Sequence, residues 1–326
     1  MSGDFGPHSS IPAAIKALEQ HAHVHLQLVG DQRALSVDQI PSNRCDIVHA
    51  PQGCPPDRSV ASVLRGDQTS SLHRCMQLVG EGTADALVSA ASSGALMALG
   101  RRTLSMIPGL TRPALCAPLP TLKHAAYLLD LGANVDVDAP ALLEYARLGS
   151  ALVTTLRSLP RPQVALLSNG AEAGKGNTVI REAAEILAAA HDIEYAGFVE
   201  GDQLFSTTAD VIVCDGLLGN VALKAAEGTA RYAAQVVNDS IAAHAAAAAT
   251  QDGMAEALSS IHSRLCDQRH GGAFLLGLNR VVVKCHGGAA AQGFEAAISK
   301  AASCVNDGIV DHLKQRLTQL ENGNHD

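Results

Sequence analysis

Aromatic residues are scarce in this chain: none of its 326 residues is tryptophan, and aromatic side chains make up 3% of it. Few side chains are therefore available to stack on the bases of a single-stranded nucleic acid. A formal net charge of -8 points the same way, because a phosphate backbone attracts a surplus of basic groups. The composition argues against a general nucleic-acid-binding protein.

Long apolar runs are also missing. The chain has no uninterrupted apolar stretch of about 18 residues, the length that a membrane-spanning helix needs. Its opening residues, MSGDFGP, lack the basic and apolar regions of a secretory signal. Hydrophobic residues nevertheless make up 47% of the chain, enough for a substantial core. We expect a globular cytoplasmic protein.

The cysteines show no paired spacing. None of the eight forms a C-x-x-C pair, and several lie in apolar, strand-like runs. This pattern favours reduced thiols in a protein core over a disulfide framework, and it offers no metal site.

Short apolar runs alternate with longer helical patterns along the chain. Strands are predicted at 24–29, 46–49, 85–89, 114–117, 126–131, 163–167, 194–199, 210–215 and 281–285. Helices are predicted at about 11–21, 70–81, 94–101, 139–157, 177–190, 219–245, 252–266 and 289–319. Nearly continuous apolar strands separated by helices are typical of a parallel sheet covered on both faces. The pattern predicts a Rossmann-like α/β fold.

The stretch PQVALLSNGAEAGKGN, at residues 162–177, runs from an apolar strand through a glycine-rich turn into a helix. Asn177 or Thr178 can cap that helix, and Lys175 supplies a positive charge beside its amino-terminal end. Free amide groups at a helix start attract anions, so the turn is a candidate phosphate site formed by Lys175, Gly174 and Gly176. The spacing is one residue short of a Walker A loop, and Gly176 replaces its Mg²⁺-binding hydroxyl, which excludes a nucleoside triphosphatase. A purely structural turn with a solvated lysine is the alternative.

Polar residues and glycines follow four more predicted strands. They are found at Ser89–Leu96, Gly132–Asp136, Gly216–Asn220 and His286–Gly288. Ligands of parallel sheets bind beyond the carboxyl ends of the strands, so we expect all five clusters to share one site at one edge. Ordinary turns would use the same residue types.

Several long motifs resemble one known family. They are GDFGP (3–7), LDLGANVD (129–136), GAEAGKGN (170–177), VCDGLLGNVALKAAEG (213–228) and GGAFLLGLNRVVVKCHG (271–287). In unbroken order over residues 3 to about 315, they resemble the PlsX family of bacterial phosphate acyltransferases. The resemblance implies a single Rossmann-like α/β/α domain over residues 1–326, with a projecting helix pair at about 219–266. It also implies a homodimer that converts acyl-acyl carrier protein and inorganic phosphate to acyl phosphate for phospholipid synthesis, without a cofactor.

That reaction requires positioning and charge neutralisation more than a relay of catalytic groups, because phosphate dianion is already nucleophilic at neutral pH. Lys175 is the first candidate for the cation at the phosphate or the oxyanion, and Lys224 is the second. His286 is a candidate proton donor to the leaving thiolate. A surface lysine at 224 and a neutral histidine held by the backbone at 286 are the alternatives.

The remaining candidate residues bind phosphate or substrate through hydroxyl, amide and carboxylate groups. Asp130 and Asp215 are expected to orient donors, with Asn134 and Asn220 as neutral partners. The full set comprises Asp4, Arg65, Ser70, Ser71, Ser89, Ser92, Ser93, Asp130, Asn134, Gly174, Gly176, Asn177, Asp215 and Asn220.

The chain departs from the family pattern at several strand ends. Ala91 and Ser92 replace a glycine and an asparagine, and we expect Ala91 to clash where a positive φ or close ligand approach is needed. Asp67 and Gln68 replace basic residues, Ser168-Asn169 replaces an Asn-Ile pair, and His270 replaces a tyrosine. Members of the family normally have a first strand of the form I-A-L-D-x-M-G before GDFGP, whereas this sequence begins at Met1: either the true start lies upstream or the chain is a diverged relative.

Residues 241–260, IAAHAAAAATQDGMAEALSS, occupy the place of the family's membrane-contacting helices. Alanine offers little apolar area for insertion, and no basic cluster accompanies it, so we expect weak or transient peripheral membrane contact and a packing or dimer role. Two classes of function remain open: an acyltransferase, with a phosphate acetyltransferase using a coenzyme A thioester as a weaker variant, and a diverged relative that only binds acyl carrier protein or an acyl ligand.

Overall fold

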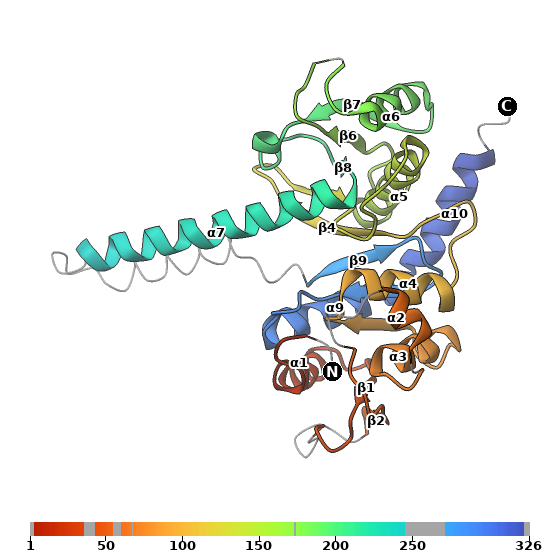
Figure 1. The fold of residues 1–326 in the computed structure, drawn as a ribbon, viewed down its shortest axis with the longest axis vertical. Helices are drawn as coiled ribbons and strands as arrows, with labels where there is room; N and C mark the ends of the chain where they lie inside the picture. Colours follow the sequence, from red (N-terminus) through yellow and green to blue (C-terminus); the bar gives the residue numbers. More distant parts are fainter. Residues whose placement is uncertain are drawn as a thin grey trace.

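The computed structural model describes residues 3–35, 43–54, 60–66, 68–172, 174–244 and 271–322. An eight-stranded sheet crosses the molecule in the order β3-β10-β9-β4-β5-β8-β6-β7. Helices flank this sheet, and one long helix, α7, points away from the body (Figure 1). Two further strands, β1 (Leu26–Gly30) and β2 (Cys45–His49), pair with each other in a separate parallel sheet. The predicted α/β/α class is confirmed.

The eight strands of the main sheet are, in sheet order, β3 (Ala86–Ser89), β10 (Val281–Lys284), β9 (Ala273–Leu276), β4 (Ala114–Pro120), β5 (Ala125–Leu129), β8 (Val211–Val213), β6 (Gln163–Leu167) and β7 (Glu194–Val199). Parallel pairing joins β3 to β10 at one end and β5, β8, β6 and β7 at the other. In the middle, β9 and β4 are antiparallel to each other and to β10 and β5.

The antiparallel centre corrects two predictions. First, β9 was not predicted as a strand. Second, the strand direction reverses three times between β10 and β5, so the carboxyl ends of β3 and β10 point opposite to those of β5, β8 and β6. The expected common edge for all five polar clusters is therefore wrong. Two of the reversals arise because residues 121–124 and 277–280 are short hairpin connections, which can join only antiparallel strands. The third is the antiparallel pairing of β9 with β4, which are far apart in the sequence.

The described helices are α1 (Pro7–Gln20), α2 (Val60–Arg65), α3 (Ser71–Gly80), α4 (Ser93–Thr103), α5 (Ala139–Arg157), α6 (Thr178–Ala189), α7 (Gly216–His244), α9 (Ala291–Asn306) and α10 (Ile309–Asn322), with a short 3-10 turn at Gly201–Gln203. The single helix predicted over 289–319 is two helices, because Gly308 adopts a φ of 60° between them. The prediction missed α2.

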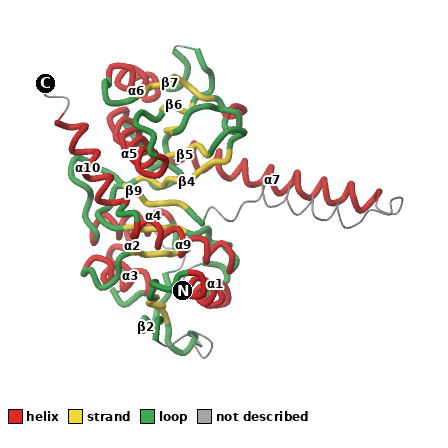
Figure 2. The backbone as a smooth tube through the Cα atoms, turned by 180° about the vertical axis from the view of Figure 1, so that it is seen from behind, coloured by secondary structure: helices red, strands yellow, loops and turns green. Residues whose placement is uncertain are grey.

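Two apolar layers hold the sheet between the helices. Side chains from α5, α6, α9 and α10 form one buried cluster with one face of the strands. Side chains from α3 and α4, with the first turns of α7, pack on the other face. Figure 2 shows helices on both sides of the strands and α7 extending beyond them. The two layers position the strand ends that carry the candidate residues.

The helix α7 extends away from the body as far as His244, where its described part ends (Figure 1). The helix predicted at 252–266 lies outside the described residues. Within the described ranges, no helix is both long and apolar enough to cross a membrane. The seven cysteines of the described part are free, as predicted, and five of them are buried.

Candidate active site

One cluster of predicted residues surrounds the Asp130 carboxylate, which is fully buried after β5. Its Oδ1 accepts hydrogen bonds from the backbone N–H groups of Leu115 (2.9 Å) and Ala133 (3.1 Å). Its Oδ2 accepts from the backbone N–H (2.7 Å) and the side-chain amide (3.0 Å) of Asn134. Burial raises the pKa of Asp130, and the four donors oppose that rise. Asp130 therefore accepts from amide donors, but those donors hold the loop after β5 in place and do not face a ligand.

The amino-terminal turn of α7 packs directly on this Asp130 cluster. A Cβ on Gly216 would lie 2.5 Å from the carbonyl oxygen of Asn134, and one on Gly219 would overlap that of Asp130. Asp215 caps the helix, since its Oδ1 accepts from the backbone N–H of Leu218 at 2.8 Å. The glycines at 216 and 219 serve close helix packing. We call residues 130–134 with the 215–220 turn, which includes Asn220, the closed cluster.

A second group gathers at the carboxyl ends of β3 and β10. The backbone N–H of Asp4 donates to the carbonyl of Gly287 at 2.8 Å, and that of Cys285 donates to the carbonyl of Ser89 at 2.8 Å. His286 is exposed, and its Nδ1 accepts from the backbone N–H of Gly288 at 3.1 Å. These contacts bring the opening residues, the end of β3 and the end of β10 together.

Two lysines complete this second group, and the sequence analysis missed one of them. Lys284 is the last residue of β10 and pairs in register with Ser89. Burial lowers the pKa of Lys284, and the positive charge of Lys224 on α7 lowers it further, while Cys285 and Glu227 oppose these effects. We call Asp4, Ser89, Lys224, Lys284 and His286 the open cluster. A lysine at the end of an otherwise apolar strand was the signal that would have pointed to Lys284.

The glycine turn follows β6, which pairs in parallel with β8, so it lies at the same edge of the sheet as the closed cluster. Asn177 caps α6 by accepting from the N–H of Ile180 at 2.9 Å, and Asn169 Oδ1 accepts from the N–H of Gly176 at 3.0 Å. Lys175 is half exposed, and its Nζ lies 3.9 Å from Glu172 Oε2. Gly174 and Gly176 have φ values of 95° and 84°, which side chains rarely adopt. The predicted strand, tight turn and helix cap are confirmed.

A buried hydroxyl faces this turn. Ser168 is 8% exposed, its Oγ makes no hydrogen bond within the described part of the chain, and a Cβ on Gly176 would lie 3.3 Å from it. Unsatisfied buried hydroxyls are uncommon and call for a partner.

The other predicted residues fall at structural positions. Ser70 and Ser92 cap α3 and α4 by accepting from the N–H groups of His73 and Ala95, both at 3.4 Å. Ser70 Oγ also lies 2.7 Å from His73 Nδ1, but both residues are buried. Ser71 is buried, Ser93 begins α4, and Arg65 bonds to the Ala61 carbonyl within its own helix α2.

Ala91 does not occupy a strained position. It is 2% exposed within the core, and it is not among the described residues with positive φ. Its N–H is satisfied by Ser89 Oγ at 3.2 Å. The expected requirement for a positive φ at residue 91 is therefore wrong, because the turn before α4 is built by serine side chains.

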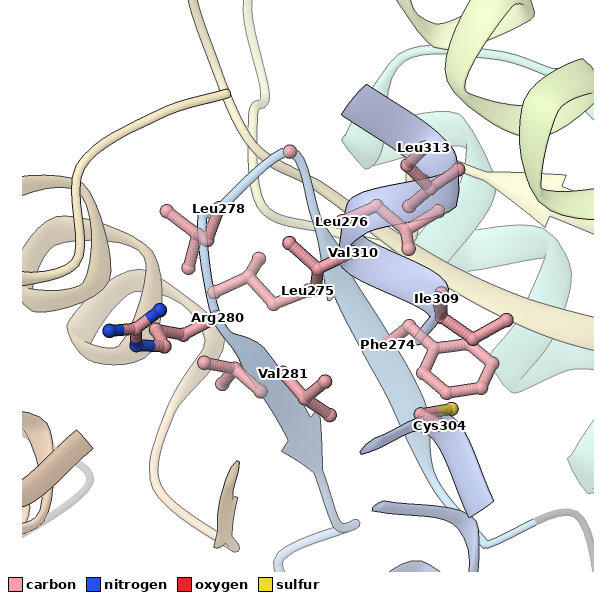
Figure 3. Close-up of a pocket in the computed structure, with 12 residues that line it drawn as sticks. Phe274, Leu275, Leu276, Leu278, Arg280, Val281, Cys304, Ile309, Val310 and Leu313 are labelled. Carbon is pink, nitrogen blue, oxygen red and sulfur yellow. The ribbon is translucent and has the colours of Figure 1, made fainter. Parts of the chain in front are cut away.

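Two hollows lie away from these clusters. A void of about 20 Å³ between the β9–β10 hairpin and α10 is lined almost entirely by apolar side chains such as Phe274, Leu276 and Ile309 (Figure 3). It holds no more than about one water and is too small for an acyl chain. An open depression of about 370 Å³ lies beside α3, lined by His49, Pro51, Gln68, Thr69, Arg74 and Gln77.

The thiols of Cys285 and Cys214 are unsuited to nucleophilic attack on a thioester. Burial raises the pKa of Cys285 to about 12, and it also raises the pKa of Cys214 well above its usual range. Both therefore remain protonated at neutral pH, where a thiolate would be the nucleophile.

Known structures share this architecture. A phosphotransacetylase from Streptococcus pyogenes superposes with a TM-score of 0.57 at 17% identity, over 96% of this chain and 93% of that one. A branched-chain phosphotransacylase from Enterococcus faecalis gives a TM-score of 0.56 at 16% identity, over 92% and 96%. At this level of identity, the likeness establishes the fold.

Sequence comparison identifies the family. A phosphate acyltransferase from Pseudomonas fluorescens is 41% identical over 98% of this chain and 96% of its own length. Another from Halorhodospira halophila is 38% identical over 98% and 95%. The family model described as fatty acid synthesis protein matches residues 1–312. The chain therefore belongs to the fatty acid synthesis protein family, alongside these phosphate acyltransferases.

Proposed function

We propose that this protein is a phosphate acyltransferase that transfers an acyl group from acyl carrier protein to inorganic phosphate. The observation that carries the proposal is its similarity, along nearly its full length, to relatives named phosphate acyltransferase. A phosphate oxygen attacks the thioester carbonyl carbon, the C–S bond breaks, and acyl phosphate and the carrier-protein thiolate are formed. The thiolate then takes up a proton.

The described residues suit direct attack by phosphate. Cys285 is buried and protonated, so it cannot take up the acyl group. Ser70 and His73, at the start of α3, are both buried and therefore cannot act as a serine–histidine nucleophile. His286 accepts a hydrogen bond at Nδ1, which leaves the proton of a neutral ring on Nε2. Because His286 is exposed, its Nε2–H can donate a hydrogen bond that stabilises the leaving thiolate, which then takes its proton from solvent.

Lys175 is the proposed cation of the glycine turn. The capped start of α6 and the unpaired Ser168 hydroxyl support an anion at this place, since both are suited to hydrogen bonding with phosphate oxygens. The Lys175–Glu172 contact, at 3.9 Å, is long enough to yield to a dianion.

A release assay tests the activity. Long-chain acyl-acyl carrier protein and acyl-coenzyme A are each incubated with phosphate, and acyl phosphate is measured. We expect acyl phosphate from the carrier-protein thioester, with the coenzyme A thioester a poorer donor. Preference for acyl-coenzyme A would instead support the phosphate acetyltransferase alternative, and no acyl phosphate from either donor would support a non-catalytic binding protein.

A variant tests the role of Lys175. Lys175→Ala should lower activity at subsaturating phosphate at least tenfold, because one charge-assisted contact contributes roughly 1.5–3 kcal/mol. Glu172→Gln is the matched control, since it removes only the partner of Lys175 and should leave the rate within about twofold. An unchanged rate in Lys175→Ala would remove Lys175 from the site.

The assembly proposal rests on α7. Leu217, Val221, Tyr232 and Val236 are all exposed, at 57%, 56%, 72% and 43%. Their spacing of 4, 11 and 4 residues keeps them on one side of the helix, where they can bury against the same surface of a second copy. We expect a two-fold dimer that stays in the cytoplasm, with at most loose peripheral membrane contact. Sedimentation as a monomer at micromolar concentration would contradict the dimer, and tight cofractionation with anionic liposomes at physiological salt would contradict weak membrane contact.

A further inference from the structure

The glycine turn has a second cation beside it, Arg181, which the sequence analysis did not single out. Arg181 lies four residues after Asn177, the cap of α6, and its side chain folds back toward the turn. Its Nη1 donates to the carbonyl oxygen of Gly176 at 2.7 Å, and its Nη2 lies 3.4 Å from Thr178 Oγ1. The guanidinium group is therefore held at the amino-terminal end of α6, where the helix dipole opposes a positive charge. An anion bound at this end would offset that cost.

The stem of Lys175 lies across the same turn. A Cβ on Gly170 would lie 2.7 Å from Lys175 Cγ and 2.9 Å from its Cδ, so a side chain at position 170 would push the stem aside. Among the described ion pairs, Lys175 has only Glu172, at 3.9 Å, and Arg181 has none. The turn thus holds two cations and one distant, exposed carboxylate, an arrangement that favours a bound anion.

Gly176 connects the polar groups of the turn. Its N–H donates to Asn169 Oδ1 at 3.0 Å, and its carbonyl oxygen accepts from Arg181. A Cβ on Gly176 would lie 3.3 Å from Ser168 Oγ, a buried hydroxyl that makes no hydrogen bond within the described ranges. Both backbone groups of Gly176 are already bonded, so the Ser168 hydroxyl needs a partner from outside the turn. The unpaired hydroxyl and the guanidinium group thus meet at one residue.

We propose that Arg181 is a second phosphate-binding residue of the glycine turn, whose guanidinium group binds phosphate oxygens together with Lys175. This inference rests on the proposed function for its choice of substrate. A guanidinium group has five N–H donors, and the two described contacts of Arg181 leave several of them free. The free donors suit two oxygens of one phosphate, while Lys175 adds a point charge. The bond to the Gly176 carbonyl keeps the guanidinium group in place.

The test compares Arg181→Gln and Arg181→Lys with the control Arg161→Gln. Glutamine keeps an amide that can donate to the Gly176 carbonyl but removes the charge, whereas lysine keeps the charge and loses the planar set of donors. Arg161 is also exposed, but it pairs with Glu194 at 2.9 Å and precedes β6, at the opposite end of that strand from the turn.

Two quantities are measured on the full-length protein. The first is the KM for phosphate at saturating acyl-acyl carrier protein. The second is the rise in Tm caused by inorganic phosphate, which needs no turnover and so separates this inference from the proposed activity. Lys175→Ala is included in the Tm measurement, because it removes the other cation of the same site.

We expect Arg181→Gln to raise the KM for phosphate about tenfold or more, as for one lost charge-assisted contact, with the KM for acyl carrier protein unchanged. Arg181→Lys should give a KM between those of Arg181→Gln and the wild type, and Arg161→Gln should match the wild type. Phosphate should raise the Tm of the wild type and of Arg161→Gln, and raise it much less in Arg181→Gln and Lys175→Ala.

A wild-type KM for phosphate and a wild-type Tm response in Arg181→Gln would overturn the proposal. A lower Tm with an unchanged phosphate response would also overturn it, because Arg181 would then only hold the turn. If Arg181→Gln does not fold, Arg181→Lys decides, and a wild-type KM with a wild-type Tm response in that variant would overturn the proposal. A wild type that makes no acyl phosphate, but whose phosphate-induced Tm rise is lost in Arg181→Gln and Lys175→Ala, would contradict the proposed function and support the binding site.

Discussion

The closed and open clusters each hold an aspartate and a short polar side chain, yet they differ in how their charged groups are paired. In the closed cluster, Asp130 accepts four hydrogen bonds and Asp215 caps α7. In the open cluster, His286 is exposed, and neither Lys224 nor Lys284 forms an ion pair with a described carboxylate. The carboxylates of the closed cluster are bonded by the protein itself, whereas the two lysines of the open cluster have no described carboxylate partner.

The closed cluster supports the fold, whereas the open cluster holds candidate residues of the reaction. Close packing of Gly216 and Gly219 on the Asp130 loop sets the direction of α7, the helix that carries Lys224. The three central antiparallel pairings put the two clusters on strands that run in opposite directions. Because α7 begins at the closed cluster and carries Lys224, the packing of its first turn positions that lysine.

The largest effect on stability is expected from removing the Asp130 carboxylate of the closed cluster. Asp130→Ala should lower the free energy of unfolding by about 3–5 kcal/mol, because several buried N–H groups lose their acceptor at roughly 1–3 kcal/mol each. Urea unfolding followed by circular dichroism measures it. Asp239→Ala, at an exposed position on α7, is the control and should change stability by less than about 0.5 kcal/mol. A loss below about 1 kcal/mol for Asp130→Ala would show that Asp130 does not hold this loop.

An intermediate effect is expected where α7 meets the closed cluster. Gly219→Ala should destabilise the protein by about 1–3 kcal/mol, since the new Cβ overlaps the Asp130 carbonyl and the helix must move. The shift should also weaken catalysis, because it displaces Lys224. Gly228→Ala in the same helix is the matched control: its Cβ would meet nothing closer than Arg231 at 4.0 Å, so helix propensity should make it neutral or stabilising by up to about 1 kcal/mol. Equal behaviour of the two variants would argue against close packing at Gly219.

The smallest effect is expected at the turn before α4. Restoring the family's glycine and asparagine with Ala91→Gly and Ser92→Asn should leave turnover within about twofold. Asparagine caps helices as well as serine does, and residue 91 has no positive φ to relieve. Stability should fall by about 0.5–1 kcal/mol from the added backbone freedom of glycine. A severalfold gain in turnover would show that Ala91 or Ser92 impairs the site.

Local structure was predictable wherever one residue type has a clear local role. The buried strand at Val164–Leu167 and the Asn177 cap of α6 followed from apolar runs and capping chemistry. The strand order did not, because three antiparallel pairings in the middle of the sheet reverse its direction, and the turns of the two hairpins among them look like ordinary loops.

The candidate site was harder to predict than the fold. Strand-end position alone did not separate Asp130, which is buried and saturated, from His286, which is exposed. Lys284 was overlooked because its strand reads as an apolar run, and its place beside Ser89 depends on the pairing of β10 with β3. Both distinctions come from tertiary contacts that the sequence does not state.

One pair of variants tests most directly whether the closed cluster supports the fold while the open cluster takes part in the reaction. Lys224→Gln and Asp215→Ala lie on the same helix but in different clusters, and each is measured for its unfolding free energy and its KM for phosphate. We predict that Lys224→Gln raises the KM at least tenfold with stability unchanged, as for a lost charge-assisted contact. Asp215→Ala should lower stability by about 1 kcal/mol, the usual loss for a helix cap, with the KM within about twofold. The reverse pattern, a wild-type KM in Lys224→Gln and a large KM increase in Asp215→Ala, would contradict the account.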